Sequence, residues 1–350
     1  MVFPHGINKL TFYCLIAVIT VLSFSSCSND EPVNPIKPLE DRTVLVLSSE
    51  GEIFDQTGKL VKVLPDCSAA TEIISEGDDY FISGVSSRGR VGYWKNGKWN
   101  TLHVDFIDDV DHHIYGIGKW DTYIYLLDLP NVLRNSGIFP LRDSELFIAP
   151  EHALKVTEGK CYIVGYELTD DETVFRPILY SNHKGYYQKE YLPLPPGYIT
   201  GECRALYVSN HNHTVVGGTI GRNPGVWIDK QCQVYQVSCP EMLEEGTYPI
   251  GRIEDITECN GHIYAAGYEY DANMELSATM WVDGVPTHYK CNPDYDGASQ
   301  AFYICSYGDD VYLLTTEYDP EVSEFITHVW LNGKILMSYR GIQAVGFTVL

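Results

Sequence analysis

Tyrosines and carboxylates recur together at matching places along this chain. A short apolar segment ends in Gly or Thr, and Tyr and Glu follow at once. The rings can stack on the CH faces of sugars, and the carboxylates can accept hydrogen bonds from sugar hydroxyls. The pattern therefore indicates a carbohydrate-binding surface. Its members are Tyr166, Glu167, Tyr268, Glu269, Tyr270, Glu317 and Tyr318, with Tyr295 and Asp296 in a further acidic loop.

The same glutamates also allow a structural interpretation. Glu167, Glu269 and Glu317 occupy equivalent positions of a repeated unit, whereas a site for one ligand is expected to use residues that break the repeat. A carboxylate at the end of each such segment would accept hydrogen bonds from backbone N–H groups of the adjacent loop. Arg88 and Arg222 do break the repeat. They could bind an acidic sugar or a carboxylate, or they could be solvated loop charges.

Catalytic chemistry has weaker support. Two carboxylates can hydrolyse a glycoside when their separation is right, but the sequence does not define a separation for Asp170 and Asp171 or for Asp294 and Asp296. Gly-x-Ser-x-Gly, Walker and Gly-x-Gly-x-x-Gly motifs do not occur. We therefore assign no catalytic residue and favour a protein that is not an enzyme over a glycan-active enzyme.

Metal and cofactor sites are not predicted either. The histidine pairs, 112–113 and 211 with 213, have no third ligand nearby in sequence, and the cysteines show no zinc spacing. Asp294-x-Asp296-Gly297 lacks the later ligands of a calcium loop. We expect no cofactor and no metal.

A hairpin signature with tryptophan organises the chain. An apolar segment ends in Trp, and an Asn-Gly or Asp-Gly pair that type I′ turns prefer follows, with Asp-Lys in the copy at Trp227. Such a unit cannot bury its apolar face alone, so the units must stack or close into a ring. The tryptophans are Trp94, Trp227, Trp281 and Trp330.

A second repeated segment has the pattern apolar-Tyr-apolar-apolar-Gly. Its copies begin near residues 80, 114, 161, 263 and 311, and a weaker copy lies at 214–218. Successive units are about 35–55 residues apart, near the period of four-stranded propeller blades. The recurring Gly suits close backbone approach near an axis.

The fold class predicted is all-β, a seven-bladed β-propeller of four-stranded blades closed by the C-terminal strand. The first unit, from Val44 to Leu64, lacks one strand, and Ala344–Val349 is a spare strand. Pairing the two closes the ring and covers exposed edges. Blades are expected to start near residues 43, 68, 103, 152, 202, 250 and 298. In the third blade, residues 122–127 are expected to replace the Trp strand and 131–140 the tight turn. Six blades plus an extra hairpin is the alternative.

The N-terminus indicates export. Residues 1–26 are predicted to be a lipoprotein signal peptide, because an apolar run of signal-peptide length ends in small residues before Cys27. Cys27 is the predicted lipidation site, residues 27–42 an acidic, Pro-rich flexible tether, and residues 43–350 the propeller. An ordinary signal peptide or an uncleaved anchor remains the alternative.

The net charge of the chain argues against two kinds of binding. The formal net charge of -23 argues against nucleic acid and against a polybasic membrane patch. Cys161, Cys203 and Cys305 fall within apolar strand patterns, where free cysteines act as small buried hydrophobes.

The Trp-x-Asn-Gly-Lys hairpins and Tyr-x-x-Gly strands resemble repeats of Bacteroidetes-type surface lipoproteins with β-propeller domains, a family of largely unknown function. The resemblance, with the acidic run after Cys27, implies an outer-membrane lipoprotein exposed at the cell surface and held to the membrane by its lipid anchor only. We expect a binding or interaction module for a glycan or a partner protein of an outer-membrane complex. A glycan-active hydrolase or lyase, or a purely structural subunit, are the alternatives.

Overall fold

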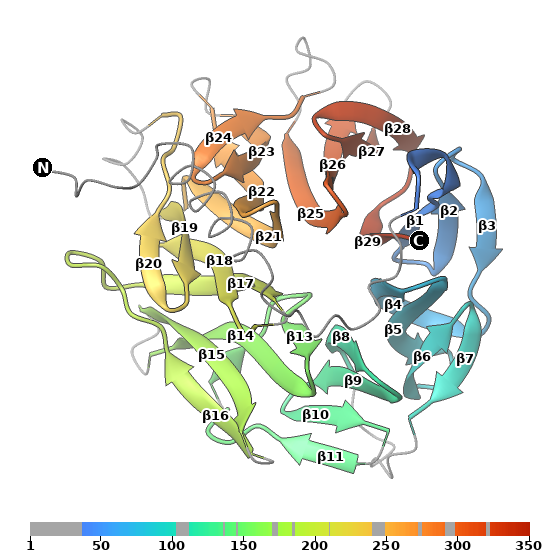
Figure 1. Ribbon diagram of the computed structural model, residues 1–350, viewed down its shortest axis with the longest axis horizontal. Coiled ribbons are helices and arrows are strands. Elements are labelled where there is room, and N and C mark those ends of the chain that lie inside the picture. The colour runs from blue at the N-terminus through green and yellow to red at the C-terminus, as the bar shows by residue number, and fades with distance from the viewer. Residues whose placement is uncertain are drawn as a thin grey trace, which may run out of the picture. The chain divides into compact units, whose positions relative to one another are not determined.

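Seven antiparallel sheets surround a common axis in the computed structural model (Figure 1). The structure describes residues 37–102, 112–135, 137–144, 146–169, 174–183, 186–209, 211–239, 249–271, 275–290, 298–319 and 323–350. Each sheet is one propeller blade, and blade 1 contains both the first and the last strand of the chain. The predicted seven-bladed propeller is therefore confirmed, and the six-blade alternative is excluded.

The first three blades contain the following strands, given from the axis outward. Blade 1 consists of β29 (Ala344–Val349), β1 (Val44–Ser48), β2 (Glu52–Asp55) and β3 (Leu60–Val63). Blade 2 consists of β4 (Cys67–Glu76), β5 (Asp79–Ser86), β6 (Val91–Lys95) and β7 (Lys98–Thr101). Blade 3 consists of β8 (Ile114–Trp120), β9 (Tyr123–Asp128), β10 (Asn131–Arg134) and β11 (Gly137–Pro140).

The remaining blades follow the same order, except that two short strands share the inner position of blade 4. Blade 4 consists of β12 (Phe147–Ile148) and β13 (Leu154–Thr157), then β14 (Lys160–Leu168), β15 (Phe175–His183) and β16 (Tyr186–Tyr191). Blade 5 consists of β17 (Gly201–Val208), β18 (Thr214–Ile220), β19 (Asn223–Ile228) and β20 (Gln231–Val234). Blade 6 consists of β21 (Gly251–Cys259), β22 (His262–Tyr270), β23 (Leu276–Val282) and β24 (Val285–His288). Blade 7 consists of β25 (Ser299–Tyr307), β26 (Asp310–Asp319), β27 (Glu324–Leu331) and β28 (Lys334–Arg340).

The C-terminal strand closes the ring as predicted. β29 pairs antiparallel with β1, with Val44 opposite Val349 and Val46 opposite Phe347. The backbones of Thr43 and Leu350 also exchange two hydrogen bonds. The edge of β1 that faces the axis is therefore covered by β29 and is not open to a foreign strand.

Blade 3 corrects one prediction. Ile114–Gly118 was expected to be a second strand, but it lies in β8, the innermost strand. Residues 122–127 then supply most of the second strand, and residues 131–140 form the third and fourth strands rather than a turn. The Tyr-x-x-Gly pattern misled the alignment because β8 also needs small residues: a Cβ on Gly116 would lie 2.8 Å from the Cβ of Leu154.

The repeated hairpins hold neighbouring blades together. The Asn or Asp of each turn has positive φ, as in Asn96 (49°) and Asp283 (49°). Its side-chain oxygen accepts a hydrogen bond from a backbone N–H near the start of the second strand, from Tyr80 in one case and Ile263 in the other. Trp94, Trp227 and Trp281 are fully buried. Their indole N–H groups donate to backbone oxygens of the segment that leaves the preceding blade. The tryptophans thus pack between blades, as the repeat predicted.

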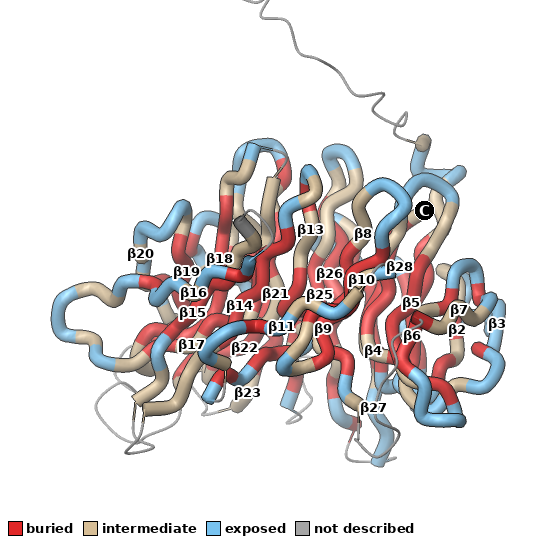
Figure 2. The backbone as a smooth tube through the Cα atoms, turned by 90° about the horizontal axis from the view of Figure 1, so that it is seen from below, coloured by how far each residue is buried: buried red, intermediate tan, exposed pale blue. Residues whose placement is uncertain are grey.

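The two faces of the propeller differ in what they carry. Segments that join second to third strands, or one blade to the next, gather on one face, which we call the loop face. Turns between first and second or third and fourth strands gather on the other, the turn face. Figure 2 shows the buried inner strands running between the two faces. The described chain begins at the turn face, where Lys37 pairs with Asp78 at 2.6 Å. The described residues contain no helix that is long and apolar enough to cross a membrane.

Candidate functional site

A β-bulge interrupts the innermost strand of six blades. In β17 the register skips Arg204, in β21 Glu254, and in β25 Phe302. β8 skips Tyr115, β4 has a skip at Thr71, and β29 has one at Val345. A bulge adds an unpaired residue and redirects its side chain, which is why bulges are common beside functional sites. Here four of the bulged side chains converge on one cavity: Tyr115, Arg204, Glu254 and Phe302.

The repeated glycine of the second strand makes room for the bulge. A Cβ on Gly218 would lie 1.9 Å from the carbonyl oxygen of Glu202, and one on Gly267 would lie 1.9 Å from that of Arg252. Both oxygens belong to residues just before the bulges. The Gly recurrence in the sequence is therefore a requirement for backbone approach near the axis.

Blade 4 departs from this plan. Its inner strand is broken into β12 and β13, which both pair with β14 and leave residues 149–153 between them. A backbone hydrogen bond holds the break against blade 3, because the Ala153 N–H donates to the carbonyl oxygen of Tyr115. Within it, His152 adopts a left-handed conformation with φ of 62°. The break brings His152 to the axis, where it lines the cavities described next.

Two cavities adjoin along the axis, and His152 and Tyr303 line both. The outer cavity opens near the loop face and has a volume of about 400 Å³. Rings and charged groups line it together. They come from His113, Tyr115, Tyr166, Phe302 and Tyr303, with Glu151, Arg204, Arg252 and Glu254.

The arginines of the outer cavity are held by carboxylates. Glu254 accepts hydrogen bonds from Arg204 at 2.8 Å and from Arg252 at 2.5 Å. Burial disfavours the charge of Arg204, but attraction to Glu254 outweighs this effect and raises the guanidinium pKa. Burial raises the pKa of Glu202, which lies 3.6 Å from Arg204. The network keeps both guanidinium groups rigid and partly neutralised at the cavity wall.

The inner cavity lies further along the same strands toward the turn face and has a volume of about 230 Å³. Glu72 is buried there. Its Oε1 lies 3.1 Å from His152 Nδ1 and 3.3 Å from Lys155 Nζ. Burial disfavours the charged carboxylate, but the attraction of Lys155 and His152 is stronger and holds the pKa of Glu72 at about 2. Burial raises the pKa of Asp255, the second carboxylate of the cavity.

Glu72 and Asp255 are also equivalent positions of the repeat, each directly after a bulge. Glu72 Oε2 accepts the Ile117 N–H of the next blade at 2.9 Å, and Asp255 Oδ2 accepts the Ile304 N–H of the next blade at 2.8 Å. The remaining Asp255 oxygen accepts the N–H of Ile256. These carboxylates therefore link blades as well as line the cavity.

The predicted tyrosines and glutamates separate in the structure. Tyr166 lines the outer cavity, and burial raises the pKa of its hydroxyl. Tyr268 lies beneath the Arg252 guanidinium, 5.1 Å from ring centre to Cζ, and is only 8% exposed. Tyr166 is therefore part of the wall of the outer cavity, whereas Tyr268 packs behind Arg252, which lines it.

The glutamates of the repeat have structural partners. Glu269 is fully buried and accepts hydrogen bonds from the Ser238 N–H and hydroxyl and from His288. Glu317 is buried beside His328. Because Ser238 belongs to the segment that leaves blade 5, Glu269 joins two blades. The structural interpretation of these repeat positions agrees with these contacts.

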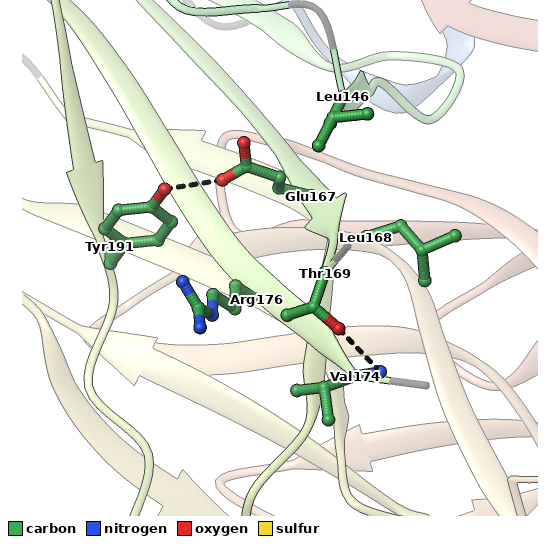
Figure 3. A pocket seen from close by; sticks show the side chains of 7 residues that line it. All are labelled: Leu146, Glu167, Leu168, Thr169, Val174, Arg176 and Tyr191. Atoms are coloured by element: carbon green, nitrogen blue, oxygen red, sulfur yellow. Dashed lines mark hydrogen bonds between the residues drawn. The ribbon is translucent and has the colours of Figure 1, made fainter. Parts of the chain in front are cut away.

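Glu167 lines a separate pocket of about 490 Å³ near the rim of blade 4 (Figure 3). The Tyr191 hydroxyl and Lys189 donate to its two oxygens. The Arg176 guanidinium lies toward the Tyr191 ring, 5.9 Å from its centre, and the Thr169 hydroxyl accepts the Val174 N–H. This pocket offers one ring and one cation rather than the multiple rings of the axial site.

The other predicted binding residues do not meet at one place. Arg88 is exposed between β5 and β6, and the Arg222 oxygen accepts the Ile250 N–H between blades 5 and 6. Tyr318 packs on Phe325 at the end of β26, and Tyr270 ends β22. Tyr295, Asp296 and Cys27 lie outside the described residues.

Sequence reasoning missed the residues that form the axial site, chiefly His152, Lys155, Arg204, Arg252 and Glu254. They lie in β13, β17 and β21 or in the break before β13, segments that have no Trp or Tyr-x-x-Gly signature. One signal was available, because charges inside these apolar strands, as in Arg252-Ile253-Glu254-Asp255, are unusual for a buried strand.

Histidines on the turn face are paired with carboxylates. His213 Nδ1 lies 2.8 Å from Asp229, and His262 Nδ1 lies 2.6 Å from Asp283. The described residues contain no cluster of three or more His, Cys, Asp or Glu side chains that could hold a metal ion. Cys67, Cys161, Cys203, Cys232, Cys259 and Cys305 are free. Cys161 and Cys203 are buried as expected, whereas Cys305 is partly buried beside the inner cavity.

No protein-family model and no curated protein sequence matches the chain. Solved structures do. The chain is similar to YCF48 bound to D1 peptide (11% identity, 89% of this chain and 97% of that chain, TM-score 0.43). It is also similar to a putative TolB from Agrobacterium tumefaciens (8%, 87% and 92%, TM-score 0.43) and to a DUF4623 family protein from Bacteroides eggerthii (8%, 85% and 87%, TM-score 0.37). At these identities and TM-scores the similarity carries no information on ligand or activity.

Proposed function

We propose that this protein is a binding module that holds a glycan in the outer axial cavity. The observation that carries the proposal is the convergence of the bulges, which direct Tyr115, Arg204, Glu254 and Phe302 into one cavity. Rings can stack on sugar CH faces, while Arg and Glu side chains can bind pairs of hydroxyls. The volume of about 400 Å³ lies within the usual range for small-ligand sites.

The experiment is a glycan array on the soluble domain from Asp41 onward, followed by calorimetry with the best ligand. Arg204→Ala combined with Tyr115→Ala should lower the affinity by about tenfold or more, since each removes a contact worth about 1 kcal/mol. Tyr191→Ala changes the rim pocket, and Arg88→Ala removes an exposed loop cation. If Tyr191→Ala abolished binding and the axial double variant did not, the site would be the rim pocket.

A glycan-active hydrolase or lyase is the second candidate. The observation in its favour is that Glu72 and Asp255 line one cavity and have pKa values shifted in opposite directions, as in acid and base pairs. Against it, both carboxylates accept backbone hydrogen bonds that link blades. Release of reducing ends or unsaturated sugars from the array's best ligand would favour the enzyme.

We further propose that the protein is an outer-membrane lipoprotein exposed at the cell surface, anchored by Cys27. The chain enters the propeller at the turn face, where Arg42 pairs with Asp310 at 2.5 Å and donates to the Tyr312 hydroxyl. Lys37 is ten positions after Cys27 in the chain, a span of at most roughly 35 Å. An anchor at Cys27 would therefore limit how far the propeller can lie from the membrane surface.

A further inference from the structure

The His152 side chain leaves one nitrogen without a partner deep in the axial site. The residue is 8% exposed, and its Nδ1 lies against the Glu72 carboxylate. Among the described residues, nothing accepts from or donates to its buried Nε2. An unsatisfied buried polar atom costs about 1–3 kcal/mol, so native proteins usually provide it with a partner. His152 lines both axial cavities, which is where such a partner would have to lie.

The protonation of His152 defines what that partner must be. Nδ1 faces a carboxylate and therefore keeps its proton. Burial disfavours a second proton, but the attraction of Glu72 is stronger and raises the pKa of His152 above its ordinary value. Protonated His152 presents Nε2–H as a donor to the cavity. The missing partner is then a hydrogen-bond acceptor.

Lys155 adds a second donor at the same place. It reaches the inner cavity from β13, and one of its three N–H groups is directed to Glu72 at 3.3 Å. The oxygens of Glu72 and Asp255 already accept hydrogen bonds from other groups. The cavity therefore combines available donors with occupied acceptors, and this arrangement favours an anionic oxygen ligand.

The volumes of the two cavities limit which part of a ligand each cavity can hold. The inner cavity, about 230 Å³, is smaller than an ordinary ligand site, whereas the outer cavity, about 400 Å³, has room for a sugar ring between aromatic side chains. A charged end group would lie in the inner cavity, and the ring would lie in the outer one. The acidic surface of the chain does not prevent this, because salt screens charges beyond roughly 8 Å while the donors are in direct contact.

We propose that the axial site binds a carboxylated sugar of the uronic-acid class, with its carboxylate accepting hydrogen bonds from His152 Nε2 and Lys155 Nζ. This inference rests on the glycan-binding function proposed above and specifies its ligand. It also differs from the sequence-based expectation for Arg88 and Arg222, because the two cations assigned to the carboxylate, His152 and Lys155, come from the broken inner strand of blade 4.

The test is calorimetry with three probes: D-glucuronate, D-glucose and acetate. The wild-type domain should bind glucuronate at least about tenfold more tightly than glucose or acetate, since two charge-assisted hydrogen bonds are added to ring stacking. Lys155→Gln should remove most of that preference. His152→Asn should do the same, because Asn tolerates the left-handed backbone and lacks the charge. The matched control is His213→Asn, which breaks a similar His–Asp pair on the turn face.

The pH dependence gives an independent readout. Glucuronate affinity should fall as the pH rises through the pKa of His152, above the ordinary value near 6.5, while glucose affinity should stay level. Lys155→Gln should keep this dependence, and His152→Asn should lose it. The titratable and charged groups that line the two cavities around His152 are Glu72, Lys155, Asp255, Tyr303 and Cys305, with His113, Tyr115, Glu151, Tyr166, Arg204, Arg252 and Glu254 on the outer side.

The outcomes are distinguishable. Equal affinity for glucuronate and glucose, or an unchanged preference in Lys155→Gln, overturns the carboxylate proposal and leaves glycan binding intact. Acetate binding as tight as glucuronate binding overturns the assignment to a sugar. If no glycan binds the wild type in the array, both proposals fail. The melting temperatures of all variants show whether they fold. If His152→Asn does not fold, the test rests on Lys155→Gln.

Discussion

Replacing Glu72 by Gln should destabilise the protein by removing the charge that links blades 2, 3 and 4. The carboxylate accepts the Ile117 N–H and pairs with His152 and Lys155. Its pKa falls from 4.5 to about 2. At 1.36 kcal/mol per pH unit, this difference corresponds to about 3 kcal/mol. Loss of one partner from a buried ion pair has a similar cost, about 3–5 kcal/mol.

The sign of the pH dependence follows from the lowered pKa. The contribution of Glu72 is fully present above the ordinary pKa of 4.5 and is lost as the pH falls toward about 2. Wild-type stability should therefore decline over that range by about 3 kcal/mol more than the stability of Glu72→Gln. At pH 7 the variant should melt roughly 5 °C lower.

Urea denaturation followed by tryptophan fluorescence at several pH values measures both effects. Glu76→Gln is the matched control, because Glu76 is on the same strand but half-exposed and should change stability by less than about 1 kcal/mol. If Glu72→Gln were as stable as the wild type at pH 7, or if its stability fell with acid as steeply, the reasoning about this buried carboxylate would be wrong.

Three further predictions concern closure, packing and anchoring. Deleting 341–350 removes β29 and its buried Phe347 and Val349 and should cost several kcal/mol, so an unchanged melting temperature would exclude ring closure by this strand. Trp281→Ala should cost about 3–5 kcal/mol in denaturation experiments, and a stable variant that loses ligand binding would assign Trp281 to a ligand instead. A fatty-acid probe should label the wild type and not Cys27→Ser in cells, and equal labelling would disprove lipidation at Cys27.

Much of the architecture was determined by local chemistry along the chain. Asn-Gly and Asp-Gly pairs accept positive φ, so each Trp hairpin could be recognised without knowing its neighbours. The spare strand at 344–349 and the incomplete first unit predicted the closure, because an open sheet edge is unfavourable. The order of strands within blade 3 could not be predicted in this way, because its inner strand carries the small residues expected of a second strand.

The axial site was decided by tertiary structure. His152 and Lys155 are neighbours in blade 4, but Arg204 and Glu254 belong to other blades and are far from them in sequence. They meet because seven inner strands approach one axis, and because bulges and the break in blade 4 turn their side chains inward. Bulges depend on register with the adjacent strand, which a single strand's sequence does not define. The buried pairing of Glu72 with a histidine 80 residues later likewise depends on the ring being closed.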